Sequence, residues 1–146
     1  MKRTKSEMIE AIYRRYLWLN EKDLNEGRIN DEVKAMCDNS AVGFKDVLEG
    51  LTEDEVLIFF HLDKGIQISV FSWHSGCANS FGMPQPMVKQ MAENLEKAME
   101  DSGYGDIPVV RKIIDKSRET LDWMLSGEYK DLGDGTGVYK FDVDKV

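Results

Sequence analysis

A histidine and a cysteine three residues apart, His74 and Cys77, are the side chains in this sequence best suited to catalysis. A cysteine becomes a strong nucleophile when a neighbouring imidazole favours its thiolate, and a third group usually orients that imidazole. Asn79 is the nearest candidate for the third role. These residues do not form a complete catalytic motif. Whether the chain is an enzyme therefore stays open, and a non-enzymatic protein is the leading interpretation.

The pair lies in segment 66–86, which contains no charged residue although 32% of the chain is charged. We expect the segment up to Trp73 to be a buried strand, and residues 74–86 to form a loop that leads into a helix. Free backbone N–H groups at a helix N-terminus attract an anion or a carboxylate. The predicted ligand-binding residues of this loop are Ser75, Gly76, Asn79 and Ser80. The glycines lack the spacing of standard phosphate-binding motifs, so the ligand class stays open.

Neither a metal site nor a cofactor is predicted. On the predicted hairpin His61 and His74 lie about 23 Å apart, since a strand rises roughly 3.3 Å per residue, so they cannot share a metal. Zinc bound by His74 and Cys77 needs two further ligands from elsewhere. Cys37 and Cys77 are too few for a disulfide framework or a paired-cysteine zinc motif, which favours a reducing compartment.

Acidic residues outnumber basic ones by 27 to 19, which gives a net charge of −8. Residues 31–65 carry nine acidic and three basic side chains, a net charge of −6, whereas residues 1–30 carry five and seven, a net charge of +2. Direct binding to nucleic acid is therefore not expected, because it depends on neutralising phosphates with Lys and Arg. The acidic excess favours a basic protein partner, or simply keeps the protein soluble.

Trp18 is the main candidate for contact with a partner. It lies off the apolar stripe of its predicted helix and stands beside Arg14 and Arg15, a combination typical of binding hot spots, so a protein partner or a homodimer is expected there. The C-terminal tail could instead cover Trp18. The acidic run Glu53, Asp54 and Glu55 is a second candidate surface. A further alternative is a groove that accepts a partner helix, lined by Met83, Met87, Met91 and Met99.

Apolar residues spaced by three and four predict four helices. The first covers about 6–26 with a cap at Ser6, and the second follows the cap Asn30, with Gly43 as a candidate break within it. The third covers about 87–101, and the fourth begins at Asp106 and ends at Gly127. The apolar stripe of the fourth helix is an alternative oligomer interface.

Residues 52–62 fit both a strand and a helix. Thr52 and Glu55 have the spacing of a helix capping box, but Val56 and the apolar residues after it are rich in β-formers. We predict a hairpin over about 56–73 and a C-terminal strand or hairpin over about 129–143. The predicted fold is therefore α+β, a single domain over 1–146 in which about four helices pack on a small, mainly antiparallel sheet.

These observations favour a non-enzymatic acidic intracellular protein that acts by binding another macromolecule, as a small inhibitor, an immunity-type protein or a regulatory factor does. The alternative is a small-ligand binder or a Cys/His-dependent enzyme that uses the 74–86 loop. No apolar run approaches the roughly 20 residues needed to cross a bilayer, and no leader-type sequence follows the basic start. We therefore expect no membrane contact and a cytoplasmic location.

Overall fold

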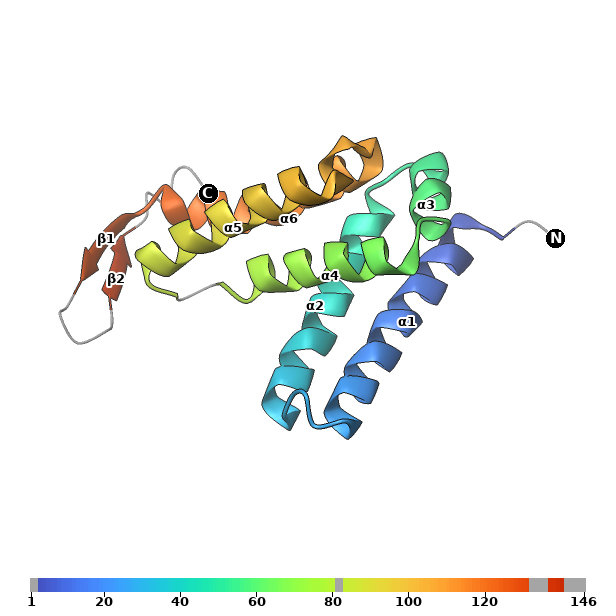
Figure 1. Ribbon diagram of the computed structural model, residues 1–146, viewed down its shortest axis with the longest axis horizontal. Helices are drawn as coiled ribbons and strands as arrows, with labels where there is room; N and C mark the ends of the chain where they lie inside the picture. The colour runs from blue at the N-terminus through green and yellow to red at the C-terminus, as the bar shows by residue number, and fades with distance from the viewer. Residues whose placement is uncertain (1–2, 81–82, 132–136, 141–146) are drawn as a thin grey trace.

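The computed structural model describes residues 3–80, 83–131 and 137–140, and the side chains of those up to residue 127. Helices dominate this part of the chain (Figure 1). In chain order the elements are α1 (Lys5–Asn25), α2 (Asp31–Glu49), α3 (Glu53–Phe60), α4 (Lys64–Ala78), α5 (Gln85–Ser102), the short 3-10 helix η1 (Tyr104–Asp106), α6 (Pro108–Leu125), β1 (Glu128–Asp131) and β2 (Gly137–Lys140).

The predicted α+β fold is wrong, because the residues assigned to the central hairpin at 56–73 are helical. The capping box outweighs the β-forming residues that follow it: the Thr52 side chain accepts a hydrogen bond from the Glu55 backbone N–H, and the Glu55 carboxylate accepts one from the Thr52 N–H. Both free donors of the first turn are thereby satisfied. In α3, Val56 and Phe59 are buried at helical spacing, so packing reinforces the cap.

The predicted hairpin turn at residues 63–65 is instead the start of α4. The Asp63 carboxylate accepts a hydrogen bond from the Gly65 N–H at 2.8 Å and caps this helix. The buried residues that follow recur at helical spacing, not in strand alternation: Gln67, Val70, Phe71, His74, Ser75 and Cys77. Tertiary burial of this face decides the structure, since β propensity is a weak and context-dependent preference.

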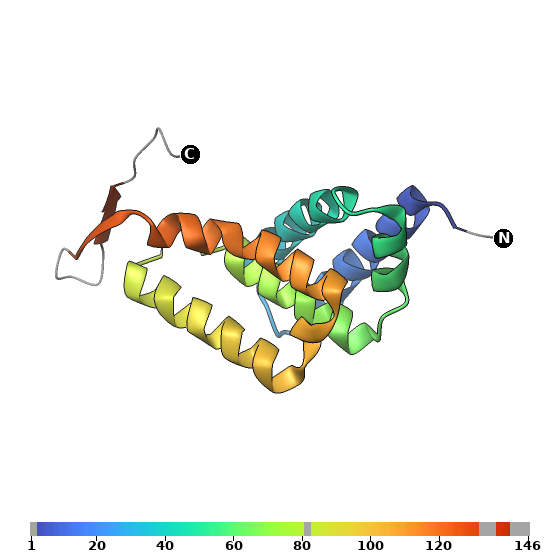
Figure 2. The same cartoon turned by 90° about the horizontal axis from the view of Figure 1, so that it is seen from above.

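The strands β1 and β2 form a two-stranded antiparallel hairpin, with Glu128 opposite Lys140. The hairpin follows α6 and lies beyond the end of the helices, not beneath them (Figures 1 and 2). It is therefore not a layer on which helices pack, as the α+β prediction requires. Part of the predicted 129–143 segment, residues 132–136 and 141–143, lies outside the described residues.

The predicted helices at the N-terminus are confirmed as α1 and α2, which form an antiparallel pair (Figure 1). The cap of α1 is Thr4, not Ser6, because Thr4 and Glu7 form a second capping box. Asn30 caps α2 as predicted. Gly43 does not divide α2; it lies opposite His74 of α4, where a Cβ would stand 3.4 Å from Nε2, an ordinary contact distance.

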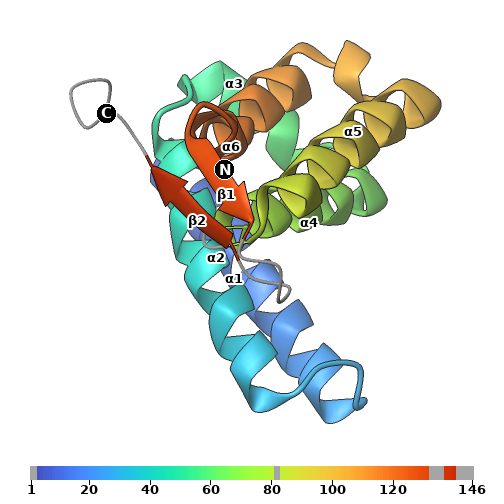
Figure 3. The same cartoon turned by 90° about the vertical axis from the view of Figure 1, so that its left-hand side faces the viewer.

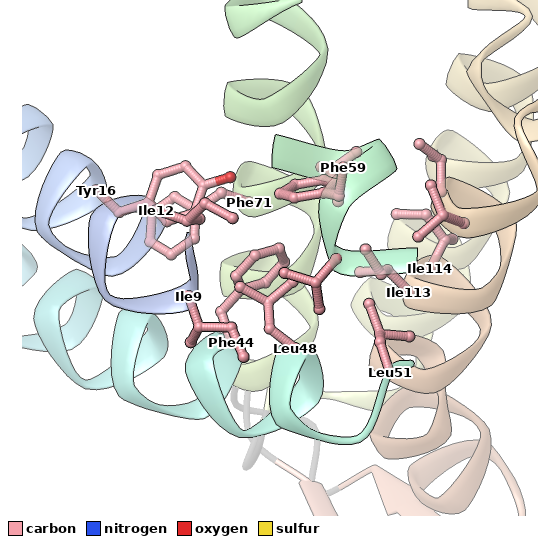
Figure 4. Packing of buried hydrophobic residues seen from close by; sticks show 14 of the residues in the cluster. Ile9, Ile12, Tyr16, Phe44, Leu48, Leu51, Phe59, Phe71, Ile113 and Ile114 are labelled. Atoms are coloured by element: carbon pink, nitrogen blue, oxygen red, sulfur yellow. The ribbon is translucent and has the colours of Figure 1, made fainter. Parts of the chain in front are cut away.

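The main core lies where α1, α2, α3, α4 and α6 meet (Figure 4). Tyr16 stacks on Phe71 with ring centroids 4.2 Å apart, and Phe44 meets Tyr16 edge-on at 5.3 Å. Phe59 of α3 contacts Phe44 at 5.8 Å. One aromatic cluster thus joins four helices that are distant in the sequence, which explains why α3 and α4 must be helical for their apolar residues to reach it.

The helices α5 and α6 pack beside α4 (Figure 2) and enclose a second, smaller core. The apolar stripe of α6 is buried in these two cores and offers no surface to a second copy of the chain. Its buried residues are Val109, Val110, Ile113, Ile114, Ser117, Leu121 and Met124. Among the described residues, no helix combines the length and apolar character needed to span a membrane.

Half of the α1–α2 pair extends past α4 without another described helix beside it (Figures 1 and 3). Ser40 marks the crossing point, because the Asn79 side-chain amide at the end of α4 donates a hydrogen bond to its hydroxyl at 3.2 Å. Residues 17–38, on the far side of this contact, are called the helical arm below.

Candidate functional site

His74 lies inside the molecule, where α4 crosses α2 and α6. Only 7% of its surface is exposed, and its Nδ1 lies 3.0 Å from the Ser117 hydroxyl. That hydroxyl also donates to the carbonyl of Ile113 at 2.9 Å, so a chain of hydrogen bonds joins His74 of α4 to the backbone of α6.

Nε2 of His74 has no hydrogen-bond partner among the described residues. Burial lowers the pKa of His74, and the nearby backbone of Ser40 offsets this effect only in part. A neutral imidazole enclosed by helices, with the Phe44 ring edge-on at 5.3 Å, joins α4 to α6. This geometry holds the core together and presents no proton acceptor to a substrate.

Cys77, the predicted nucleophile, is 1% exposed and packs in the second core. Burial raises the pKa of the Cys77 thiol to about 11, so the thiol stays protonated at neutral pH. A thiol in this state is a poor nucleophile, because reactivity depends on the thiolate. The proposed orienting residue Asn79 donates hydrogen bonds to Ser75 and Ser40, both at 3.2 Å.

The other predicted ligand-binding residues belong to α4 or to the turn that ends it, so the expected loop does not begin at residue 74. Ser80 is buried and donates to the carbonyl of Cys77 at 2.7 Å. Gly76 faces α5, where an added Cβ would stand 3.1 Å from Cε of Met91. Two of these residues line hollows: Gly76 lines one between α4 and α5, and Ser75 lines a groove on another side of α4.

The groove lies between the helical arm and α4 and has a volume of about 480 Å³. Its apolar lining consists of Leu19 from α1, Cys37 from α2, and Ile68 and Phe71 from α4. The polar lining residues are Asn20, Asp23, Arg28, Ser72 and Ser75. The sequence patterns assigned the apolar members to the core, and no local signal indicated that they would line an open groove beside α4.

Trp18, the predicted partner contact, points outward from α1. It follows the buried Tyr16 by two residues, about 200° around the helix, and it is 62% exposed. The Lys22 ammonium lies 5.5 Å from the centroid of its ring. Arg14, one turn earlier on the same face, is 77% exposed in its side chain and pairs with Glu10 at 3.0 Å. The described strands of the tail, β1 and β2, lie away from α1 (Figure 1), and the structure brings Trp18, Arg14 and Lys22 together.

Arg15 separates from this group. Its guanidinium donates to the side-chain oxygen of Gln67, a buried residue of α4. The side-chain amide of Gln67 donates in turn to the backbone carbonyl of Phe59 at 2.8 Å. The Tyr16 hydroxyl donates to the backbone carbonyl of Gln67, also at 2.8 Å. Arg15 therefore takes part in fixing α1 against α3 and α4, and is less free to contact a partner than Arg14.

The acidic run at residues 53–55 forms the first turn of α3, where carboxylates stabilise the positive end of the helix dipole. Glu55 is fully engaged: it completes the capping box and accepts a hydrogen bond from the Lys112 ammonium at 3.0 Å. The Thr52 backbone N–H and then Lys112 lower the pKa of Glu55. Glu53 and Asp54 are exposed, so only these two are open to a partner.

The predicted methionine groove is divided. Met99 is buried, Met91 packs toward α4, and Met87 is 54% exposed. Between α4 and α5 there is a hollow of about 290 Å³ that includes Met91 but neither Met87 nor Met99 in its lining.

The described residues contain no group of three or more His, Cys, Asp and Glu side chains arranged to hold a metal ion. His61 lies at the end of α3 and meets the Phe60 ring edge-on at 5.2 Å. Comparisons with protein-family models, with curated proteins and with solved structures gave no match, so this chain is assigned to no family.

Proposed function

We propose that this protein acts without catalysis, by binding a protein partner through the outer face of α1. One observation carries the proposal: a tryptophan that points away from the core is 62% exposed on a helix between two exposed basic side chains. Burying such an indole in an interface contributes roughly 2–4 kcal/mol. Tryptophan and arginine are also the residue types most enriched in hot spots.

The charge around Trp18 supports an acidic contact surface on the partner. Arg14 and Lys22 lie one turn before and one turn after Trp18, on the same face. Residues 1–30 are net positive in a chain with a net charge of −8. Complementary charges speed association and reject wrong partners. A protein suits this face better than a nucleic acid, because the overall negative charge repels phosphates.

The protein's role under this proposal is that of an inhibitor or regulatory factor in the cytoplasm. Two free cysteines support a reducing compartment. The burial of His74 and Cys77 weakens the alternative of a Cys/His-dependent enzyme, because both side chains are enclosed in the core and the Cys77 thiol stays protonated at neutral pH.

Affinity capture with variants tests the proposal. Immobilised wild-type protein, Trp18→Ala and the control Met87→Ala are exposed to a lysate, and retained proteins are quantified by mass spectrometry. Met87 is similarly exposed but lies on α5, so its substitution controls for the loss of an exposed apolar side chain. We expect a stoichiometric partner on the wild type and on Met87→Ala, with its affinity lowered about 30-fold or more by Trp18→Ala.

The binding constant is then measured with the purified partner, and circular dichroism checks that each variant is folded. If every retained protein binds Trp18→Ala as tightly as the wild type, the assignment of this face is refuted. Turnover of a substrate by the purified protein, without any stoichiometric partner, would refute the non-enzymatic function itself.

A further inference from the structure

The inner face of the helical arm carries a second binding surface, independent of Trp18. The face of α2 that contacts α4 continues toward the N-terminus of the helix, because Val33 and Met36 precede Cys37 and Ser40 by one turn each. Ser40 is buried where α4 crosses, whereas Val33 and Met36 are 37% and 45% exposed beyond the crossing. An apolar helix face thus begins inside the core and ends without a cover among the described residues.

This face adjoins the groove. Cys37 belongs to both, and Leu19, Ile68 and Phe71 supply the apolar floor from α1 and α4. The apolar face of α2 from Val33 to Ser40 is about 10 Å long, or two helical turns. Two side chains at positions i and i+7 of a partner helix are the same distance apart. An amphipathic helix that docks in a groove uses anchors at this spacing.

The charges around this surface are predominantly acidic. Residues 21–38 contain six acidic and three basic side chains. Lys34 pairs with Asp38 at 2.7 Å and with Glu21 at 3.5 Å, so this group of three keeps a charge of −1. Arg28 is likewise shared between two carboxylates, Asp23 at 3.1 Å and Glu26.

Glu32 adds a further carboxylate in the exposed first turn of α2, one turn before Met36. It has no basic partner among the ion pairs of the described residues. The surface around the groove therefore combines an apolar floor with a net negative edge.

We infer that this groove binds an amphipathic helix of a partner protein, with apolar anchors on one face and Lys or Arg along its flanks. The apolar anchors cover Val33, Met36 and the groove floor, and the basic flanks pair with the carboxylates of the arm. Charge complementarity decides the partner's chemistry, because an acidic helix would place like charges against this edge. Met36 suits such a site, since its flexible thioether adapts to different apolar side chains.

A synthetic peptide tests the inference. The probe is a fluorescein-labelled helix of about 18 residues, or five turns, with leucine on one face and lysine elsewhere, titrated with the full chain by fluorescence anisotropy. A scrambled peptide of the same composition and an analogue with glutamate in place of lysine serve as comparisons. We expect saturable binding of the basic amphipathic peptide only, with affinity reduced as salt is added.

Two matched pairs of variants locate the site. Ser72→Arg places a bulky positive charge in the groove, while Gln90→Arg makes the same charge change at an exposed position of α5. Met36→Gln and Met87→Gln remove an exposed methionine from α2 and from α5. We expect Kd to rise about tenfold or more for Ser72→Arg and roughly fivefold for Met36→Gln, with the control variants within about twofold of the wild type.

Three results would each overturn the inference: no saturable binding, equal binding of the scrambled or acidic peptide, and equal losses in the groove and control variants. Trp18→Ala keeps its affinity for the peptide if the two surfaces are independent. A shared loss in that variant would place the peptide on the outer face of α1 and so also contradict the groove assignment.

Discussion

The buried imidazole of His74 makes the stability of this protein depend on pH. Burial lowers its pKa in the folded state below the ordinary value of 6.5. As the pH falls through 6.5, the unfolded chain therefore takes up a proton that the folded protein still rejects. The contribution of neutral His74 to the free energy of unfolding is fully present above about pH 6.5. Below that pH the free energy of unfolding declines by up to about 1.4 kcal/mol per pH unit, until the pH reaches the pKa of His74 in the folded state.

The variant His74→Gln isolates this effect. A glutamine amide still donates a hydrogen bond and does not titrate, so the contact with the Ser117 hydroxyl is retained in kind. Urea unfolding followed by circular dichroism between about pH 5 and pH 8 gives the free energy of unfolding of each protein. We expect the difference between wild type and variant to change with pH below 6.5 and to be constant above it.

The control is His61→Gln, which makes the same substitution at the exposed end of α3, outside the crossing of α2, α4 and α6. Carboxylates with lowered pKa, Glu10 and Glu55, add their own loss of stability only as the pH falls below about 4.5. Parallel curves for wild type and His74→Gln from pH 8 to pH 5 would refute the neutral, desolvated imidazole and with it the role of His74 at the helix crossing.

Two further predictions follow from the same geometry. Thr52→Ala removes the cap of α3 and should lower the free energy of unfolding, measured in urea, by about 1 kcal/mol. The control Thr120→Ala, in the interior of α6, should lower it by less. Equal decreases in the two variants would mean that the cap contributes nothing. A thiol reagent should modify Cys37 in the native protein and Cys77 only in denaturant. The reason is that Cys37 is partly exposed, whereas Cys77 is buried and its pKa is raised to about 11. Peptide mapping that finds Cys77 labelled as fast as Cys37 in the native protein would contradict this.

The helices at the two ends of the chain were predictable because their local signals agree. Asn30 caps α2, Gly103 in a left-handed conformation ends α5, and Pro108 begins α6. In each helix the apolar stripe has a period near 3.6, so cap and stripe point to one structure. The exposure of Trp18 followed from the same arithmetic, since its position lies off the stripe.

The middle of the chain was not predictable in this way, because two local signals conflict there. The capping box at Thr52 favours a helix, and the β-forming residues after it favour a strand. Only the positions of Phe44 and Tyr16, both distant in the sequence, show that Phe59 and Phe71 must meet them from helical faces.

The sequence by itself determined the composition of this protein's surfaces: an acidic segment, an outward tryptophan beside basic residues, and a segment of 21 residues without charge. Tertiary structure decided what the uncharged segment does. Most of it is α4, whose buried face packs against α1, α2 and α6, and a charge on that face would be costly to bury. It also decided the angle at which α4 crosses the α1–α2 pair, and thereby left the inner face of the arm open as a groove beside α4, since a crossing angle depends on packing between helices and not on local sequence.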